Sequence, residues 1–303
     1  MTKTYAEREK ERQAGLIQAK DEVFYGAEGG GLYDGKKSHE YILKDAKCNF
    51  YAPIQAAACE YFAENGIKWW GGDGRQPTGD TVSSQVACLN HLFALRKDKD
   101  AVLDLVNGIR GEYEEVLPLA CDKEGGYIAF EVVSDKDHLN EQGHTRGEYC
   151  TSVDALLLAK RQDGKRILFR IEWKYTESYG NVDRSTEVTK DGHDRGKVRL
   201  LRYTELINAS RQLKTLESYV GSVYYREPFY QMMRQTLWAD QMIAHRDEDL
   251  VQADDFVHVD VIPRGSEGLE GVEATWREML TDQSKYVVTT PRGFRIPRTQ
   301  RLR

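Results

Sequence analysis

The chain has 303 residues, of which 40% are hydrophobic and 30% are charged, and its formal net charge is −6. This length and apolar content allow a sizeable core, either one large domain or one domain with an appendage. No apolar run approaches the length of a membrane span, and the first residues lack a signal-peptide core. We therefore expect a cytoplasmic protein without membrane contact. The five cysteines are scattered without a CxxC pair, which argues against a zinc site and is typical of reduced thiols.

The first half of the chain is predominantly helical in pattern. Residues 1–22 predict a solvent-exposed helix or frayed arm, and residues 24–38 a glycine-rich loop without the order of a phosphate-binding loop. The apolar spacing and the helix-start signals then predict three helices. These span residues 54–64, a stretch from Asp80 or Thr81 to Lys97, and residues 101–117. A strand over residues 126–133 follows, and a polar loop then extends to Gly147.

Residues 150–177 hold the most informative pattern in the chain. Two β-rich runs, residues 151–160 and 166–175, flank a polar turn that contains Asp163-Gly164. A three-residue loop, residues 162–164, would place Gly164 at the left-handed position of a type I turn with a G1 bulge. That register pairs Arg161 with Lys165 and brings Asp154 opposite Glu172.

The same register separates the two faces of the hairpin. One face is entirely apolar, whereas the other carries Asp154, Glu172 and Lys174. Directly paired carboxylates repel each other unless a positive charge lies nearby. Lys174 supplies one such charge, and Mg²⁺, which proteins hold through one or two carboxylates and water, could supply more.

Asp154, a turn and then Glu172-Trp173-Lys174 resemble the signature of the PD-(D/E)xK nuclease superfamily. The segments RGEYCTSVDALL and IEWKYTES resemble those of bacterial restriction endonucleases in that superfamily, with Val153 in place of the motif's proline. The resemblance, loosely over residues 75–290, implies that Asp154, Glu172 and the Trp173 carbonyl bind Mg²⁺, with Mn²⁺ as a substitute. It also implies that Lys174 is the catalytic lysine, that DNA is the substrate, and that a homodimer is possible.

A further acidic ligand is less clearly marked. Glu131 and Glu141 are the candidates, and the wording around Glu141 places it slightly ahead. Gln85 occupies the place of the upstream motif helix, but a neutral amide is a poor Mg²⁺ ligand. Taken singly, each of these residues is more often an ordinary surface group.

The region after the hairpin is basic and then helical. Residues 184–214 are rich in lysine and arginine, and residues 285–303 are basic without an acidic residue, which for a terminus favours a solvated tail. Residues 177–198 predict a long loop, and a mixed helical stretch should open at Arg202-Tyr203. Pro228 then starts a strong helix, on which Tyr230 and Gln231 are candidates to face the site. A strand over 256–262, a helix over 273–280 and a strand over 286–290 complete the pattern.

Helices before and after a strand-rich centre predict an α/β (α+β) fold in three layers. With the resemblance, this is a restriction-endonuclease-like core whose mixed central sheet is flanked by helices. We expect an N-terminal extension over residues 1–75, a nuclease-like domain over 76–290 and a basic tail over 291–303. The expected function is Mg²⁺-dependent hydrolysis of DNA. Two alternatives remain open, a catalytically inactive nucleic-acid-binding protein of the same fold and an incidental charged hairpin face.

Overall fold

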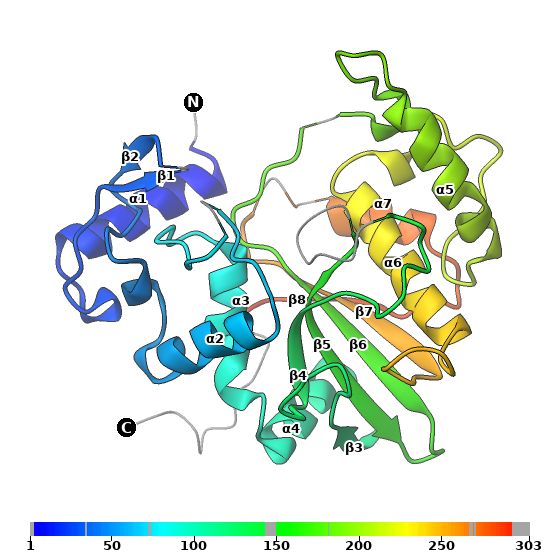
Figure 1. Ribbon diagram of the computed structural model, residues 1–303, viewed down its shortest axis with the longest axis horizontal. Coiled ribbons are helices and arrows are strands. Elements are labelled where there is room, and N and C mark those ends of the chain that lie inside the picture. The colour runs from blue at the N-terminus through cyan, green and yellow to red at the C-terminus, as the bar shows by residue number, and fades with distance from the viewer. Residues whose placement is uncertain are drawn as a thin grey trace.

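The computed structural model describes residues 3–33, 35–71, 74–142, 150–180, 182–266, 269 and 271–292. Its centre is a six-stranded sheet (Figure 1). The strands of this sheet are β3 (Tyr113–Leu117), β4 (Ile128–Val132), β5 (Val153–Arg161), β6 (Arg166–Trp173), β7 (Asp255–Val261) and β8 (Tyr286–Thr289). The α-helices are α1 (Tyr5–Gln18), α2 (Ala52–Glu64), α3 (Ser84–Leu92), α4 (Lys99–Ile109), α5 (Arg195–Ala209), α6 (Phe229–Ala244) and α7 (Val272–Met279).

The sheet is mixed. The strand order is β3-β5-β6-β7-β8, and β4 also pairs with β5, along the half that β3 does not reach. Pairing is antiparallel among β3, β4, β5 and β6, and parallel from β6 through β7 to β8. The expected mixed central sheet is therefore confirmed.

Helices cover both faces of the sheet, which gives three layers (Figure 1). One face packs against α2, α3 and α4 in a single apolar cluster that includes Leu157 and Phe169. The other face packs against α5, α6 and α7 in a second cluster that includes Leu156 and Leu168. Because neighbouring strand residues point to opposite faces, β5 and β6 contribute to both clusters.

The turn between β5 and β6 has the predicted form. Arg161 N donates to the Lys165 carbonyl at 2.9 Å, and Gly164 has a φ of +82°, where a side chain would be strained. The ladder pairs Ala155 with Ile171 and Lys160 with Arg166, which is the register of the three-residue loop. This prediction is confirmed.

The N-terminal segment is more ordered than predicted. Helix α1 starts with a capping box between Thr4 and Glu7, and it buries one face instead of being solvent-exposed all round. The expected glycine-rich loop contains a short hairpin formed by β1 (Gly31–Tyr33) and β2 (Lys37–His39). A small cluster of Ile17, Phe24 and Leu43 holds this segment together. Helix α2, which also precedes residue 75, packs instead into the cluster beneath the sheet.

Three element boundaries were predicted wrongly. Helix α3 begins after Ser83, whose hydroxyl accepts from Val86 N, because Asp80 is used in a preceding turn in which it accepts from Val82 N. Helix α5 begins after Asp194, which caps it two turns before the predicted opening. Short 3₁₀ turns lie over Glu22–Phe24, Ala46–Asn49, Phe93–Leu95, Arg184–Thr186 and Val223–Tyr225.

The third wrong boundary concerns residues 101–117, which were predicted as one helix. Helix α4 ends at Ile109, and the chain turns back as strand β3. The Asn107 side chain donates to the Tyr113 carbonyl at 3.1 Å and accepts from Tyr113 N at 3.0 Å, which closes the turn. Strand β3 then pairs with β5, so its backbone N–H and C=O groups form sheet hydrogen bonds in place of the predicted helical ones.

Within the described residues, no helix is both long and apolar enough to cross a membrane.

Candidate active site

The candidate catalytic residues meet where β5 begins and β6 ends. The ladder pairs Ala155 with Ile171, so the next step brings Asp154 opposite Glu172, as predicted. Asp154 Oδ2 accepts a hydrogen bond from Trp173 N at 2.7 Å, which fixes the carboxyl against the last residue of β6. Glu172 is only 3% exposed and Asp154 is partly buried, so bulk water has limited access to the pair.

Lys174 completes this group. Its Nζ lies 2.6 Å from Glu172 Oε1 and also donates to Gln231 Oε1 at 2.6 Å. The Gln231 amide in turn donates to Glu172 Oε1 at 2.8 Å. Asp154, Glu172, Lys174 and Gln231 are therefore brought together from β5, the end of β6 with the residue that follows it, and helix α6.

Helix α6 supplies a second amide that the sequence did not single out. Gln235, one turn after Gln231, donates to Glu172 Oε2 at 2.5 Å and to the Ser152 carbonyl at 3.0 Å. The side-chain Oε1 of Gln235 accepts a hydrogen bond from the fully buried guanidinium of Arg170. The spacing of four residues places both glutamines on one helix face, and this spacing was a signal available in the sequence.

The electrostatics of the group are unfavourable for a carboxylate pair. Burial, and then the charges of Glu172 and Glu131, raise the pKa of Asp154 well above its ordinary value. Burial alone would lower the pKa of Lys174, but the Glu172 carboxylate raises that pKa well above its ordinary value. Lys174 is thus a fixed cation beside one carboxylate, and the other carboxyl lacks an equivalent partner among the described residues.

Glu131, the acidic candidate ranked second from the sequence, lies beside this group. Strand β4 pairs Phe130 with Ala155 and Val132 with Val153, which places Glu131 opposite Asp154. Glu131 has a φ of +50°, a left-handed conformation that is uncommon for a residue with a side chain. The Gln85 amide donates to Glu131 Oε1 at 2.8 Å, so Gln85 contacts an acidic neighbour of the site.

Glu141, ranked ahead of Glu131 from the sequence, lies in a different network. Its carboxylate is buried and accepts from Thr151 N at 2.5 Å, Thr151 Oγ1 at 2.8 Å and Tyr203 Oη at 2.6 Å. Arg234 Nε also donates to it, at 2.9 Å. These bonds tie the end of the polar loop to α5 and α6, and the structure does not group Glu141 with Asp154 and Glu172.

A third polar group lies beyond Glu172 in the sheet. Asp260 on β7 pairs with Glu172 and accepts from Tyr286 Oη at 2.8 Å, and it lies 2.8 Å from His258 Nε2. Burial, and then the charge of Arg170, lower the pKa of His258 to about 4. His258 and Asp260 are ionisable residues within the mostly apolar strand β7. Ionisable residues in an apolar strand were also the sequence signal that identified Asp154 and Glu172.

The donor set suits a hard cation bound by few protein ligands. Two adjacent carboxyl groups, Glu172 buried and Asp154 partly buried with a raised pKa, are the type of oxygen pair that Mg²⁺ uses together with water. Across the described ranges, no three His, Cys, Asp or Glu side chains form a cluster that could hold a metal by themselves. The ring of Trp173 packs in the core against His91, with ring centroids 4.8 Å apart, and a ligand role of its carbonyl stays a prediction.

Comparisons with curated proteins and with solved structures gave no match. A family described as Restriction Endonuclease associating with ARP matches residues 10–300. The match covers nearly the whole chain, including the β5–β6 hairpin, α6 and the later part of the N-terminal helix α1. The chain therefore belongs to the family of restriction endonucleases associating with ARP.

Proposed function

We propose that this protein is an endonuclease that hydrolyses DNA phosphodiester bonds with Mg²⁺, using a site of the PD-(D/E)xK type. The observation that carries the proposal is the convergence of Asp154, Glu172 and Lys174 at one end of the hairpin. Membership of a restriction endonuclease family supports the reaction class. A charged face formed by chance would not be expected to lie buried beneath a helix that supplies two amides to it.

In this proposal, Asp154 and Glu172 hold the cation. When bound, Mg²⁺ would offset the charge that develops on the phosphoryl oxygens and lower the pKa of a water molecule. Gln231 and Gln235 orient Glu172 through its two carboxylate oxygens. Because the pKa of Lys174 is raised, Lys174 stays protonated and orients the attacking water or a phosphate oxygen, instead of removing a proton.

Plasmid nicking tests this proposal directly. Purified protein should nick supercoiled DNA with Mg²⁺ or Mn²⁺ and not with EDTA, and Lys174→Ala should slow cutting by about a thousandfold. Lys174→Gln, which keeps a hydrogen-bond donor near Glu172, separates loss of the charge from loss of the fold. Lys165→Ala, in the exposed turn of the same hairpin, should cut at the wild-type rate.

Two results would contradict the proposal. Cutting that persists in Lys174→Ala would remove the lysine from the mechanism. DNA that is bound in a salt-dependent way but never cut would favour the inactive DNA-binding alternative.

A further inference from the structure

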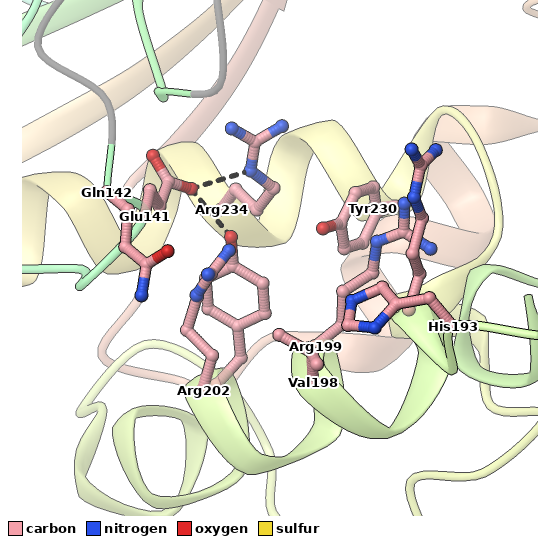
Figure 2. Close-up of a pocket in the computed structure, with 10 residues that line it drawn as sticks. Glu141, Gln142, His193, Val198, Arg199, Arg202, Tyr230 and Arg234 are labelled. Carbon is pink, nitrogen blue, oxygen red and sulfur yellow. Dashed lines mark hydrogen bonds and ion pairs between the residues drawn. The ribbon is translucent and has the colours of Figure 1, made fainter. Parts of the chain in front are cut away.

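A second polar cavity lies between α5 and α6, separate from the carboxylate pair. It measures about 510 Å³, and Figure 2 shows the side chains that surround it. Four arginines and two tyrosines form much of its wall: Arg195, Arg199, Arg202, Arg234, Tyr203 and Tyr230. Tyr230 and Arg234 each stand one residue before a glutamine that binds Glu172. Neighbouring faces of α6 therefore contact the cavity and the carboxylate pair.

Positive charge exceeds negative charge in this cavity. Glu141 is the acidic residue in its wall, and it binds Arg234 through Nε alone. Just outside, Glu187 accepts from Arg199 at 3.0 Å, lies 3.4 Å from Arg195, and is shared with Arg184. Among the described residues, one carboxylate thus pairs with three guanidinium groups there, and Glu227 is a second partner of Arg184 alone.

Two arginines keep unused donors. Within the part of the chain that the structure describes, the Arg202 side chain forms no ion pair or hydrogen bond, and its guanidinium lies 5.8 Å from the centre of the Tyr203 ring. Among the same residues, the two terminal nitrogens of Arg234 have no hydrogen-bond partner, because its one bond to Glu141 is made by Nε. Guanidinium groups with free terminal nitrogens are suited to bidentate binding of an anion.

The wall that holds these donors is preorganised. Arg199 and Arg234 lie over the Tyr230 ring, at 5.6 and 5.4 Å from its centre. Tyr203 donates to the buried Glu141, which is itself fixed by Thr151 N and also accepts from Arg234 (Figure 2). Aromatic and carboxylate contacts therefore restrict the arginines before any ligand arrives, which lowers the entropic cost of binding.

We propose that this cavity binds a phosphomonoester carried by a nucleotide, either a free nucleotide or the phosphorylated end of a DNA strand. Arginine forks match the geometry of phosphate oxygens, and several converge here. The volume lies within the usual range of small-ligand sites and exceeds what one phosphate ion would fill. This inference does not rest on DNA hydrolysis, because binding here uses none of the residues that would hold a metal.

Calorimetric titration in EDTA, where no metal-dependent cutting can occur, tests the proposal. The probes are adenosine monophosphate and one short oligonucleotide, prepared with a 5′-phosphate and with a 5′-hydroxyl. We expect a phosphate-bearing probe to bind, and Arg202→Ala to weaken it by about tenfold or more. Lys197→Ala, which removes one exposed positive charge from the same helix, should change the affinity by less than about twofold.

Each outcome bears on the proposal. Equal binding of the monophosphate and the phosphorylated oligonucleotide supports a free nucleotide, whereas tighter binding of the phosphorylated oligonucleotide than of either other probe supports a DNA end. Arg202→Lys should restore the affinity only in part, because lysine keeps the charge and loses the fork. Absence of binding by both phosphate-bearing probes, or equal losses in Arg202→Ala and Lys197→Ala, would overturn it.

Discussion

The surroundings of Asp154 disfavour the charged form of its carboxyl group. Its carboxyl accepts from Trp173 N, but the neighbours that act on it most strongly are the carboxylates of Glu172 and Glu131. A folded-state pKa above the unfolded value means that its contribution to stability is complete in acid and is lost as the pH rises through the folded pKa. At neutral pH the metal-free protein therefore carries an electrostatic cost at this residue, and a bound cation would offset that cost.

Replacing Asp154 with asparagine should consequently separate stability from function. Asp154→Asn keeps an oxygen for Trp173 N and removes the charge, so the free energy of unfolding without metal should rise by about 1 kcal/mol at pH 7. The gain should shrink toward pH 4, and DNA cutting should be lost. Urea unfolding at the two pH values measures the first effect.

The matching control is Asp247→Asn, because the Asp247 side chain is 94% exposed. That variant should leave both stability and cutting unchanged. Adding Mg²⁺ should stabilise the wild type and Asp247→Asn, and should not stabilise Asp154→Asn. A destabilised Asp154→Asn protein would contradict this account of Asp154.

For single residues, the sequence was sufficient to predict positions that depend on local backbone geometry. A short hairpin fixes its register through the turn, so the pairing of Asp154 with Glu172 followed from the position of Gly164. Glu131 could not be placed in the same way, because its position depends on how β4 pairs with β5 after a long polar loop. The preference for Glu141 over Glu131 rested on neighbouring sequence, which does not determine tertiary pairing.

Helix α6 connects the candidate active site with the arginine-lined cavity. Gln231 and Gln235 contact Glu172 from one face of α6, and Tyr230 and Arg234 line the cavity from the neighbouring face of the same helix. The start of this helix at Pro228 was predicted, and Gln231, one of the two residues expected to face the site, contacts Lys174 and Glu172. The contacts of Gln235 with Glu172 and Arg170 could not be read from the sequence, because they depend on how α6 lies across the sheet.

Removing the amide of Gln231 should lower activity with little effect on folding. Gln231→Ala leaves Lys174 bound to Glu172 but less firmly oriented, and cutting should fall by about 10- to 100-fold. Single-turnover cleavage measures this fall, and thermal unfolding should stay within about 2 °C of the wild type. Gln241→Ala, near the other end of the same helix, is the control and should cut normally.

A purely structural role for Gln231 predicts a different result. In that case, cutting would fall only in proportion to the loss of folded protein. We expect cutting to fall while the protein stays folded, because Lys174 loses a contact that orients it.

Element types were harder to predict where tertiary pairing decides them. Residues 101–117 have a helical pattern throughout, but their last five form β3, because Asn107 closes a turn and β5 offers an unpaired edge. Helix α5 was predicted too short, since Asp194 lies within a polar stretch whose capping role the pattern did not reveal. In contrast, β7, α7 and β8 were each placed to within one residue, because clear alternation or amphipathic spacing defines them.

Over the whole molecule, the N-terminal segment is fastened to the sheet near the candidate site. Tyr175, which follows Lys174, donates to Glu9 Oε1 at 2.5 Å and accepts from Gln13 Nε2 at 3.0 Å. Arg8 also donates to the Gly265 carbonyl, at 3.2 Å. Figure 1 shows α1 on the opposite side of the molecule from α5. The three-layer arrangement was predictable from the order of elements, whereas this docking was not.

Loss of the Tyr175 hydroxyl should loosen α1. Tyr175→Phe leaves the buried Glu9 with one partner fewer, which should cost about 1–2 kcal/mol. Hydrogen exchange measures the effect, and amides of α1 should exchange faster while those of β6 stay protected. Tyr33→Phe, at an exposed position, is the control. Unchanged exchange in α1 would show that Tyr175 does not hold this helix.

The central claim is that Asp154 and Glu172 together bind one divalent cation. Anomalous diffraction from crystals soaked in Mn²⁺ tests it most directly, because the ion is located without reference to activity. We predict one strong anomalous peak within coordination distance of both carboxyl groups, and its absence in Asp154→Asn crystals. A peak that avoids both residues, in a protein that nevertheless cuts DNA with Mn²⁺, would contradict the account.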